Sequence, residues 1–168
     1  MPTTYYLLAS LYLLKRQHEL AILEAEKAVA LGPNLAESHV YLGQILSFAG
    51  KPEEAILHHE RSIRLDPFAR SSYFHLLGMA YREAGRYEEA ITACQKAIQR
   101  QQNNLFAHLI LAATYIMIGR EDEARAEATE VLRINPKFSV ERMVKVRPHI
   151  DPANTVRFAD ALRKAGLK

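Results

Sequence analysis

Apolar residues recur along most of the chain at spacings of three and four, with charged and polar residues between them. This period is typical of amphipathic α-helices, whereas strands would alternate every second residue. Short connections separate the helical stretches, and all but the first contain Gly, Pro or Asn, so the pattern predicts neighbouring helices packed side by side. The predicted helices are residues 3–15, 18–31, 36–49, 52–65, 71–84, 87–100, 105–118 and 121–134.

The same arrangement of large and small side chains occurs four times. Each copy has an aromatic residue or histidine, a leucine three positions later, then a small residue, and a tyrosine or leucine three positions after that. The small residues are spaced 34, 35 and 34 apart, and an alanine follows each one by twelve positions. These sets begin with Tyr5, His39, Phe74 and His108, have Ala9, Gly43, Gly78 and Ala112 as the small residues, and have Ala21, Ala55, Ala90 and Ala124 as the alanines.

This repeat resembles that of the tetratricopeptide-repeat (TPR) family, which has 34 residues and matching aromatic, Leu-Gly, Tyr, Ala and Pro positions. The resemblance implies an all-α solenoid, a right-handed superhelix of antiparallel helix pairs, in which small residues allow close helix contact. It divides residues 2–136 into four repeats of about 2–35, 36–70, 71–104 and 105–138.

The remaining residues, 137–168, are expected to form a capping segment for the last repeat. Ser139–Val146 predicts a short helix, and Asp151 followed by Pro152 predicts the start of a second helix that ends near Lys164. An apolar stripe on this second helix is expected to cover the solenoid end. Its members are Val156, Phe158, Ala159, Leu162 and Ala165.

The tail also resembles the end of TPR regions in bacterial class III adenylate cyclase-like signalling proteins. The similar segments are Phe138–Arg142, Asp151–Ala153, Arg157–Phe158 and Leu162–Leu167. The resemblance implies that the chain is the non-catalytic C-terminal part of a larger signalling protein. No cyclase domain fits within these residues, so no cyclase activity is implied.

The distribution of charge and the length of the longest apolar run limit which classes of partner we expect. The net charge of +3 combines −2 over residues 1–136 with +5 over residues 137–168. A basic tail suits nucleic acid, an acidic partner or simply a charged helix surface, but aromatic and basic residues are not interleaved as in nucleic-acid modules. The apolar run Tyr5–Leu14 is about half the length of a membrane span. We therefore expect neither nucleic acid nor a membrane as partner.

The residues with reactive side chains do not form a recognisable catalytic or metal motif. His39 and His108 occupy the aromatic position of the repeat, and the neighbours His58 and His59 do not share a helix face. Cys94 lies on the predicted core stripe, and its being the single cysteine excludes an intramolecular disulfide and favours a reducing, cytoplasmic compartment. We expect no enzymatic activity, no cofactor and no metal.

The resemblance to TPR proteins places a ligand groove on the first helix of each repeat, one, five and eight positions after the aromatic position. The set lacks the Lys, Asn and Arg of a carboxylate clamp apart from one arginine, so a C-terminal carboxylate is not favoured as ligand. A protein or peptide segment is the expected partner. The predicted groove residues are Tyr6, Ser10, Leu13, Val40, Gln44, Ser47, His75, Met79 and Arg82.

A different function is compatible with the same sequence. The first predicted helix is apolar nearly all round, which suits contact with another domain or with a second copy of the chain. Self-association through residues 3–16 is therefore the alternative to ligand binding in the groove.

Overall fold

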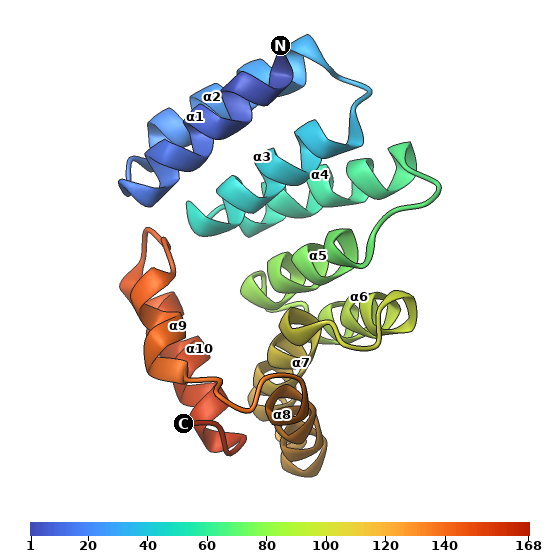
Figure 1. Cartoon of the computed structure of the whole chain (residues 1–168), viewed down its shortest axis with the longest axis vertical. Helices are drawn as coiled ribbons and strands as arrows, with labels where there is room; N and C mark the ends of the chain where they lie inside the picture. Colours follow the sequence, from blue (N-terminus) through green and yellow to red (C-terminus); the bar gives the residue numbers. More distant parts are fainter. The chain divides into compact units, whose positions relative to one another are not determined.

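The computed structural model describes all residues, Met1–Lys168, and contains ten α-helices and no strand (Figure 1). Each of the eight repeat helices begins and ends within one residue of its prediction. The helices are α1 (Pro2–Leu14), α2 (His18–Leu31), α3 (Ala36–Phe48), α4 (Pro52–Leu65), α5 (Ser71–Glu83), α6 (Tyr87–Arg100), α7 (Leu105–Met117), α8 (Glu121–Ile134), α9 (Val140–Val146) and α10 (Pro152–Lys164).

The turn inside each helix pair has one residue in the left-handed region. Gly50, Gly85 and Gly119 have φ of 75°, 76° and 77° directly after the first helices of three pairs. Glycine favours this conformation because it has no Cβ to clash with the following carbonyl. Arg16 takes the equivalent place after α1 with φ 57°, so this turn forms without the glycine.

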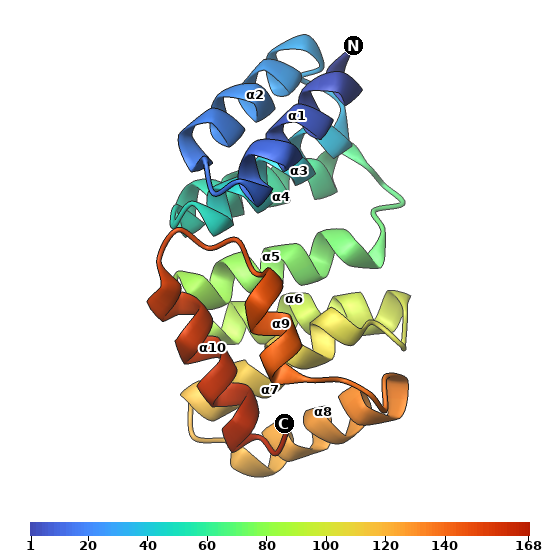
Figure 2. The same cartoon turned by 60° about the vertical axis from the view of Figure 1, so that its left-hand side comes forward.

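The chain forms two compact units. The first comprises Met1–Ala69 with Pro148–Asp151, and the second comprises Arg70–Arg147 with Pro152–Lys168. In the first unit α1 pairs with α2, α3 pairs with α4, and α2 packs against α3 (Figure 1). In the second unit α5 pairs with α6 and α7 with α8, and α6 packs against α7. The helix α10 contacts both α7 and α9, which run beside it in Figure 2.

The small repeat residues lie where the two helices of a pair approach most closely. A Cβ on Gly43 would lie 2.8 Å from the ring of His59, and one on Gly78 would overlap the Sγ of Cys94. Ala9 and Ala112, at the same repeat position, are fully buried. The repeat pattern therefore identified the contacts within the helix pairs correctly.

The apolar stripe of the C-terminal segment is largely buried in the second unit. Phe158, Ala159, Leu162 and Ala165 are buried, and α10 carries them against α7. Val156 was expected in the same stripe but is half exposed, because its position on α10 turns it away from the helices that α10 contacts.

Candidate ligand groove

In the first unit, Tyr6 is the groove residue with the most clearly defined contacts. It lies on α1, and its hydroxyl forms a 2.5 Å hydrogen bond with the Oγ of Ser38 at the start of α3. Its ring stacks on Tyr41 of α3 with centroids 4.6 Å apart. Both contacts join the first helices of two successive repeats, so Tyr6 is buried and contributes to repeat packing.

A segment from the C-terminal part of the chain completes the first unit at the turn between α1 and α2. The backbone N–H of Ile150 donates a 2.8 Å hydrogen bond to the carbonyl of Phe48, at the end of α3. The ring of Phe48 meets His149 edge to face at 4.8 Å, and His149 is almost fully buried. His18, at the start of α2, lies 2.6 Å through its Nε2 from the carbonyl oxygen of Pro148. The segment Pro148–Asp151 is thus fixed by both ring packing and backbone hydrogen bonds.

In the second unit, His75 belongs to a polar network between α5 and α7. The Nδ2 of Asn104 donates hydrogen bonds to the Oγ of Ser71 at 2.6 Å and to the Nδ1 of His75 at 3.0 Å. The Oδ1 of Asn104 accepts from the backbone N–H of Ala107 and caps α7. Burial lowers the pKa of His75 to about 4, so the ring is neutral at pH 7. His75 is therefore a hydrogen-bond acceptor that orients the start of α7.

The other two groove residues of the second unit lie beneath the tail. The guanidinium carbons of Arg82 and Arg147 each lie 4.6 Å from the centroid of the Phe158 ring. Arg147 also reaches the sulfur of Met79, with its Nη2 3.7 Å from Sδ. The quadrupole of an aromatic ring attracts a cation placed above its face, so this position is favourable for an arginine side chain. The tail therefore fills this part of the predicted groove with an aromatic side chain and an arginine.

This cluster contains more positive than negative charge. Arg82 forms an ion pair with Glu83, Nη2 to Oε1 at 3.5 Å, and both side chains are at least nine-tenths buried. Burial lowers the pKa of Arg82, and burial together with the charge of Arg82 lowers the pKa of Arg147 to about 10. Packing of the tail thus places two cations in a poorly solvated site, next to the carboxylate of Glu83.

The predicted groove residues differ in how far they remain accessible. Tyr6, Leu13, Val40, Ser47 and Met79 are buried, and the side chain of Arg82 is nine-tenths buried, whereas Ser10, Gln44 and His75 are partly exposed. The first helices do carry all nine residues at the expected positions. The sequence did not reveal how closely neighbouring repeats and the tail cover them.

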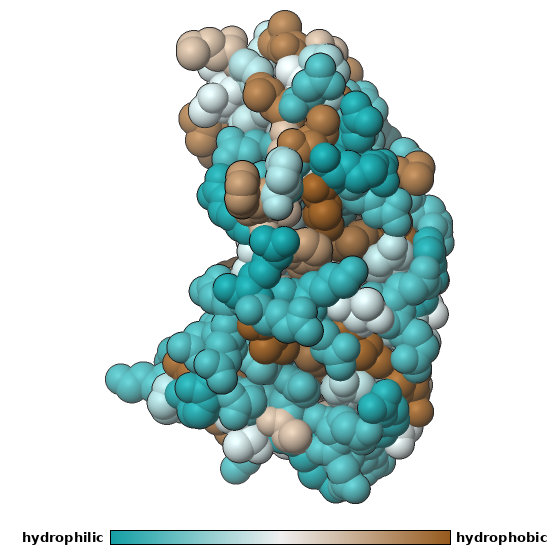
Figure 3. Space-filling model, turned by 90° about the vertical axis from the view of Figure 1, so that its right-hand side faces the viewer, coloured by the Kyte–Doolittle hydropathy of each residue, from teal (hydrophilic) through white to brown (hydrophobic).

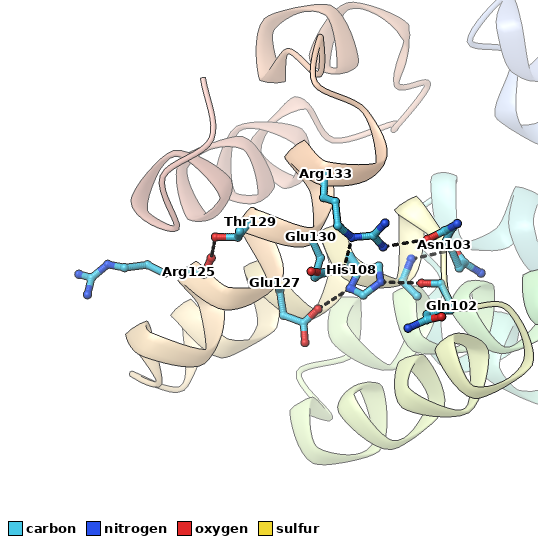
Figure 4. Close-up of polar contacts among 10 residues, drawn as sticks. Gln102, Asn103, His108, Arg125, Glu127, Thr129, Glu130 and Arg133 are labelled. Atoms are coloured by element: carbon cyan, nitrogen blue, oxygen red, sulfur yellow. Dashed lines mark hydrogen bonds and ion pairs between the residues drawn. The ribbon is translucent and has the colours of Figure 1, made fainter.

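Two histidines form a contact that recurs in the repeat and that the sequence analysis missed. The Nε2 of His39 lies 3.0 Å from the carbonyl oxygen of Pro33, and the Nε2 of His108 lies 3.1 Å from that of Gln102. Their Nδ1 atoms meet the side chain nineteen positions later. For His39 this is His58, at 2.9 Å, and for His108 it is Glu127, at 2.6 Å, the pair drawn in Figure 4. The common nineteen-residue interval was the signal that could have revealed these pairs.

The histidine pairs connect the two helices of a repeat to the preceding loop. In the second unit, His108 lies at the base of a groove between α6 and α8 with a volume of about 520 Å³, and Glu127 and Glu130 line one side of it. The ring of His108 donates hydrogen bonds to the carboxylate of Glu127 and the carbonyl of Gln102, and these raise its pKa despite the opposing effect of burial. Glu130 forms an ion pair with Arg133, which also reaches Asn103 (Figure 4). These hydrogen bonds and ion pairs fix the polar side chains where the helices of the repeat meet the preceding loop.

The chain's reactive side chains are not arranged as a metal or nucleophile site. No three His, Cys, Asp or Glu side chains are grouped so that they could hold a metal ion. Cys94 is fully buried, as predicted, and burial raises the pKa of its thiol far above the usual range. The thiolate form that would act as nucleophile is therefore disfavoured.

Comparison with protein families decides which family these helix pairs represent. Sequence profiles described as tetratricopeptide repeat match residues 2–35, 40–104 and 81–145. The chain is a tetratricopeptide-repeat protein. TPR proteins are generally non-catalytic scaffolds that bind other proteins.

Solved structures of other TPR proteins share this fold at low sequence identity. MamA is 22% identical with a TM-score of 0.68, and the alignment covers 94% of this chain and 91% of MamA. PilW, described as a type IV pilus biogenesis factor, is 16% identical with a TM-score of 0.78, covering 98% and 74%. TTC0263, a TPR protein from Thermus thermophilus, is 22% identical with a TM-score of 0.73, covering 97% and 82%. At these identities the similarity shows the TPR fold.

The comparisons do not extend the identification beyond the repeats. A comparison with curated protein sequences gives no match. The similarity of the tail to adenylate cyclase-like proteins finds no support in the matched families or structures. None of the ten helices combines the length and apolar character needed to cross a membrane.

Proposed function

We propose that this TPR protein is a non-catalytic interaction module that binds a protein or peptide segment along the first helices of its repeats. The supporting observation is that the tail already occupies part of the predicted groove in the second unit. There Phe158 packs against Arg82, and Arg147 packs against Met79. This surface therefore accepts an aromatic side chain beside a charged one, which are the groups a peptide ligand would offer.

The groove in the first unit is the more accessible part for such a ligand. Ser10 on α1 and Gln44 on α3 are partly exposed and polar, next to the buried side chains of Tyr6 and Val40. Polar groups beside an apolar floor fix the register of a bound segment, while the floor provides hydrophobic contact. A cytoplasmic location, a place in a larger signalling protein and the absence of nucleic-acid binding stay predictions.

Site-specific photo-crosslinking tests this proposal. A photoreactive amino acid at Gln44 is expected to capture a protein in extracts of the native host, while the same group at Leu57, on the exposed side of α4, is not. The captured protein is then purified and titrated against the parent and against a Ser10→Arg/Gln44→Arg variant. We expect the variant to bind at least tenfold more weakly with unchanged thermal stability. Equal affinity, or capture from Leu57 alone, would exclude this groove as the site.

A further inference from the structure

A stripe of exposed leucines runs along α1. Leu7, Leu11 and Leu14 are 65%, 55% and 71% exposed, and their spacing of four and three places them on one helix face. Ala9, which is fully buried in contact with α2, lies on the opposite face. The helix contains no charged residue, so nothing on this face interrupts its apolar character.

The equivalent positions in other repeats are the ones that receive a neighbouring helix pair. Leu7 and Leu11 stand two residues before and after the small residue of their repeat. In α7 these positions are Ile110 and Thr114, which are buried where α7 packs against α6. In α3 the first of them, Tyr41, stacks on Tyr6 of α1 but stays 38% exposed, and the second, Ile45, is 3% exposed on a helix that packs against α2. The leucine stripe is therefore a repeat-stacking surface that lacks a covering helix in this structure.

On the face drawn in Figure 3, hydrophilic side chains predominate and hydrophobic ones form scattered groups. The exposed large apolar residues of the chain include three leucines of α2, Leu20, Leu23 and Leu31, in addition to those of α1. Contiguous apolar surface of this kind marks sites of association in folded proteins, because water hydrates it poorly.

The outward surface of the fourth repeat does not complement the stripe. Directly after the repeat alanine of each second helix, α4 and α6 have the buried residues Ile56 and Ile91, but α8 has Arg125. Arg125 is exposed and forms ion pairs with Glu121 at 2.8 Å and Asp122 at 3.3 Å. Stacking this surface on leucines would desolvate an arginine without a new partner, which is unfavourable. A head-to-tail contact between copies is therefore disfavoured.

We infer that the leucine stripe of α1 binds the same stripe of a second copy of this chain in a two-fold contact. Such a contact pairs an uncharged apolar surface with an identical one, so that no charge is buried. It uses one surface of each chain and closes after two copies, as isologous interfaces do. This self-association goes beyond the groove function. Ser10 borders the stripe, because it lies three residues after Leu7 and four before Leu14, whereas the groove residue Gln44 belongs to α3.

The mass of the full chain in solution tests the inference. Size-exclusion chromatography with light scattering, over about 1–100 µM, is expected to give twice the 19.1 kDa chain mass at the upper concentrations. A Leu7→Glu/Leu11→Glu variant is expected to run at 19.1 kDa throughout, with association weakened at least tenfold. Both side chains are more than half exposed, so the circular dichroism and melting temperature of the variant should match the parent.

Two matched variants show whether the effect is specific to the stripe. Leu57→Glu changes a leucine on α4 that is 64% exposed, and Leu132→Glu changes a partly exposed leucine on α8. Both are expected to keep the doubled mass. A parent that stays at 19.1 kDa over the whole range, or a Leu7→Glu/Leu11→Glu variant that keeps the doubled mass, overturns the inference. Dissociation by Leu132→Glu overturns it as well, because the contact would then be head-to-tail.

Discussion

At the scale of single residues, the histidines show how one repeat position serves different chemistry in different environments. His108 keeps a raised pKa because Glu127 and a loop carbonyl hydrogen-bond its ring. His58, the partner of His39, has a lowered pKa because it is partly buried and faces another imidazole. His75 has no carboxylate among its hydrogen-bond partners and is the most strongly shifted of the three. Their contributions to stability therefore depend on pH in opposite directions.

The lowered pKa of His75 predicts a loss of stability in mild acid. The unfolded chain binds a proton near pH 6.5, whereas the folded chain resists protonation of this ring until about pH 4. The contribution of His75 is thus complete above about pH 6.5 and declines as the pH falls toward 4. Its upper bound is about 3 kcal/mol. Urea unfolding at about pH 7, 5.5 and 4.5 should show a smaller acid loss for His75→Gln, which keeps a neutral acceptor for Asn104.

His108 provides the control of opposite sign. Its pKa is raised, so its contribution is complete below the unfolded value and is lost as the pH rises through the folded value. The His108→Gln variant should therefore keep the acid loss of the parent and lose stability mainly below about pH 6.5. If His75→Gln has the same pH dependence as the parent, His75 does not contribute to the acid loss.

At the scale of helices, sequence predicted what depends on spacing within the chain. The positions of Ala9, Gly43 and Gly78 fixed both the repeat length and the side of each first helix that contacts its partner, and the structure confirms these contacts. The coverage of Met79 and Arg82 could not be predicted in the same way. The stripe containing Phe158 indicated only that α10 needs an apolar partner surface, and spacing does not specify which surface of another helix it meets.

The docking of α10 predicts unequal effects for two substitutions on that helix. Phe158 is buried between helices and contacts two arginines, so Phe158→Ala should lower the free energy of unfolding by about 3–5 kcal/mol. Val156 lies on the same helix but is half exposed, and Val156→Ala should change it by less than about 0.5 kcal/mol. Chemical denaturation followed by circular dichroism measures both. Similar values for the two variants would mean that α10 does not hold its position through Phe158.

At the scale of the whole molecule, the C-terminal segment contributes to the packing of both units. Residues 148–151 belong to the first unit, where His149 packs against Phe48, and α9 and α10 belong to the second. The backbone N–H of Val140, at the start of α9, also donates a 2.8 Å hydrogen bond to the carbonyl of Lys168. This hydrogen bond joins the start of α9 to the last residue of the chain, so the C-terminal segment has contacts within itself as well as with the repeats.

Removal of this segment predicts a loss of stability that affects both units. A chain ending at Pro136 lacks the buried side chains of His149, Phe158 and Leu162, and it exposes the surface of α7 that α10 covers. Each large apolar side chain contributes about 1.5–3 kcal/mol when buried, so the total loss is a large part of the roughly 5–15 kcal/mol typical of a domain. The truncated chain should melt at a lower temperature, bind more of a hydrophobic dye and scatter more light than the parent.

The full chain with Lys164→Ala, a change on the exposed side of α10, serves as control and should behave as the parent does. A truncated chain with the parent's melting temperature and no added dye binding would show that the repeats are stable without the tail. Phe158 and His149 would then occupy the repeats without supporting them, and the groove residues beneath would be free for a partner once the tail is displaced.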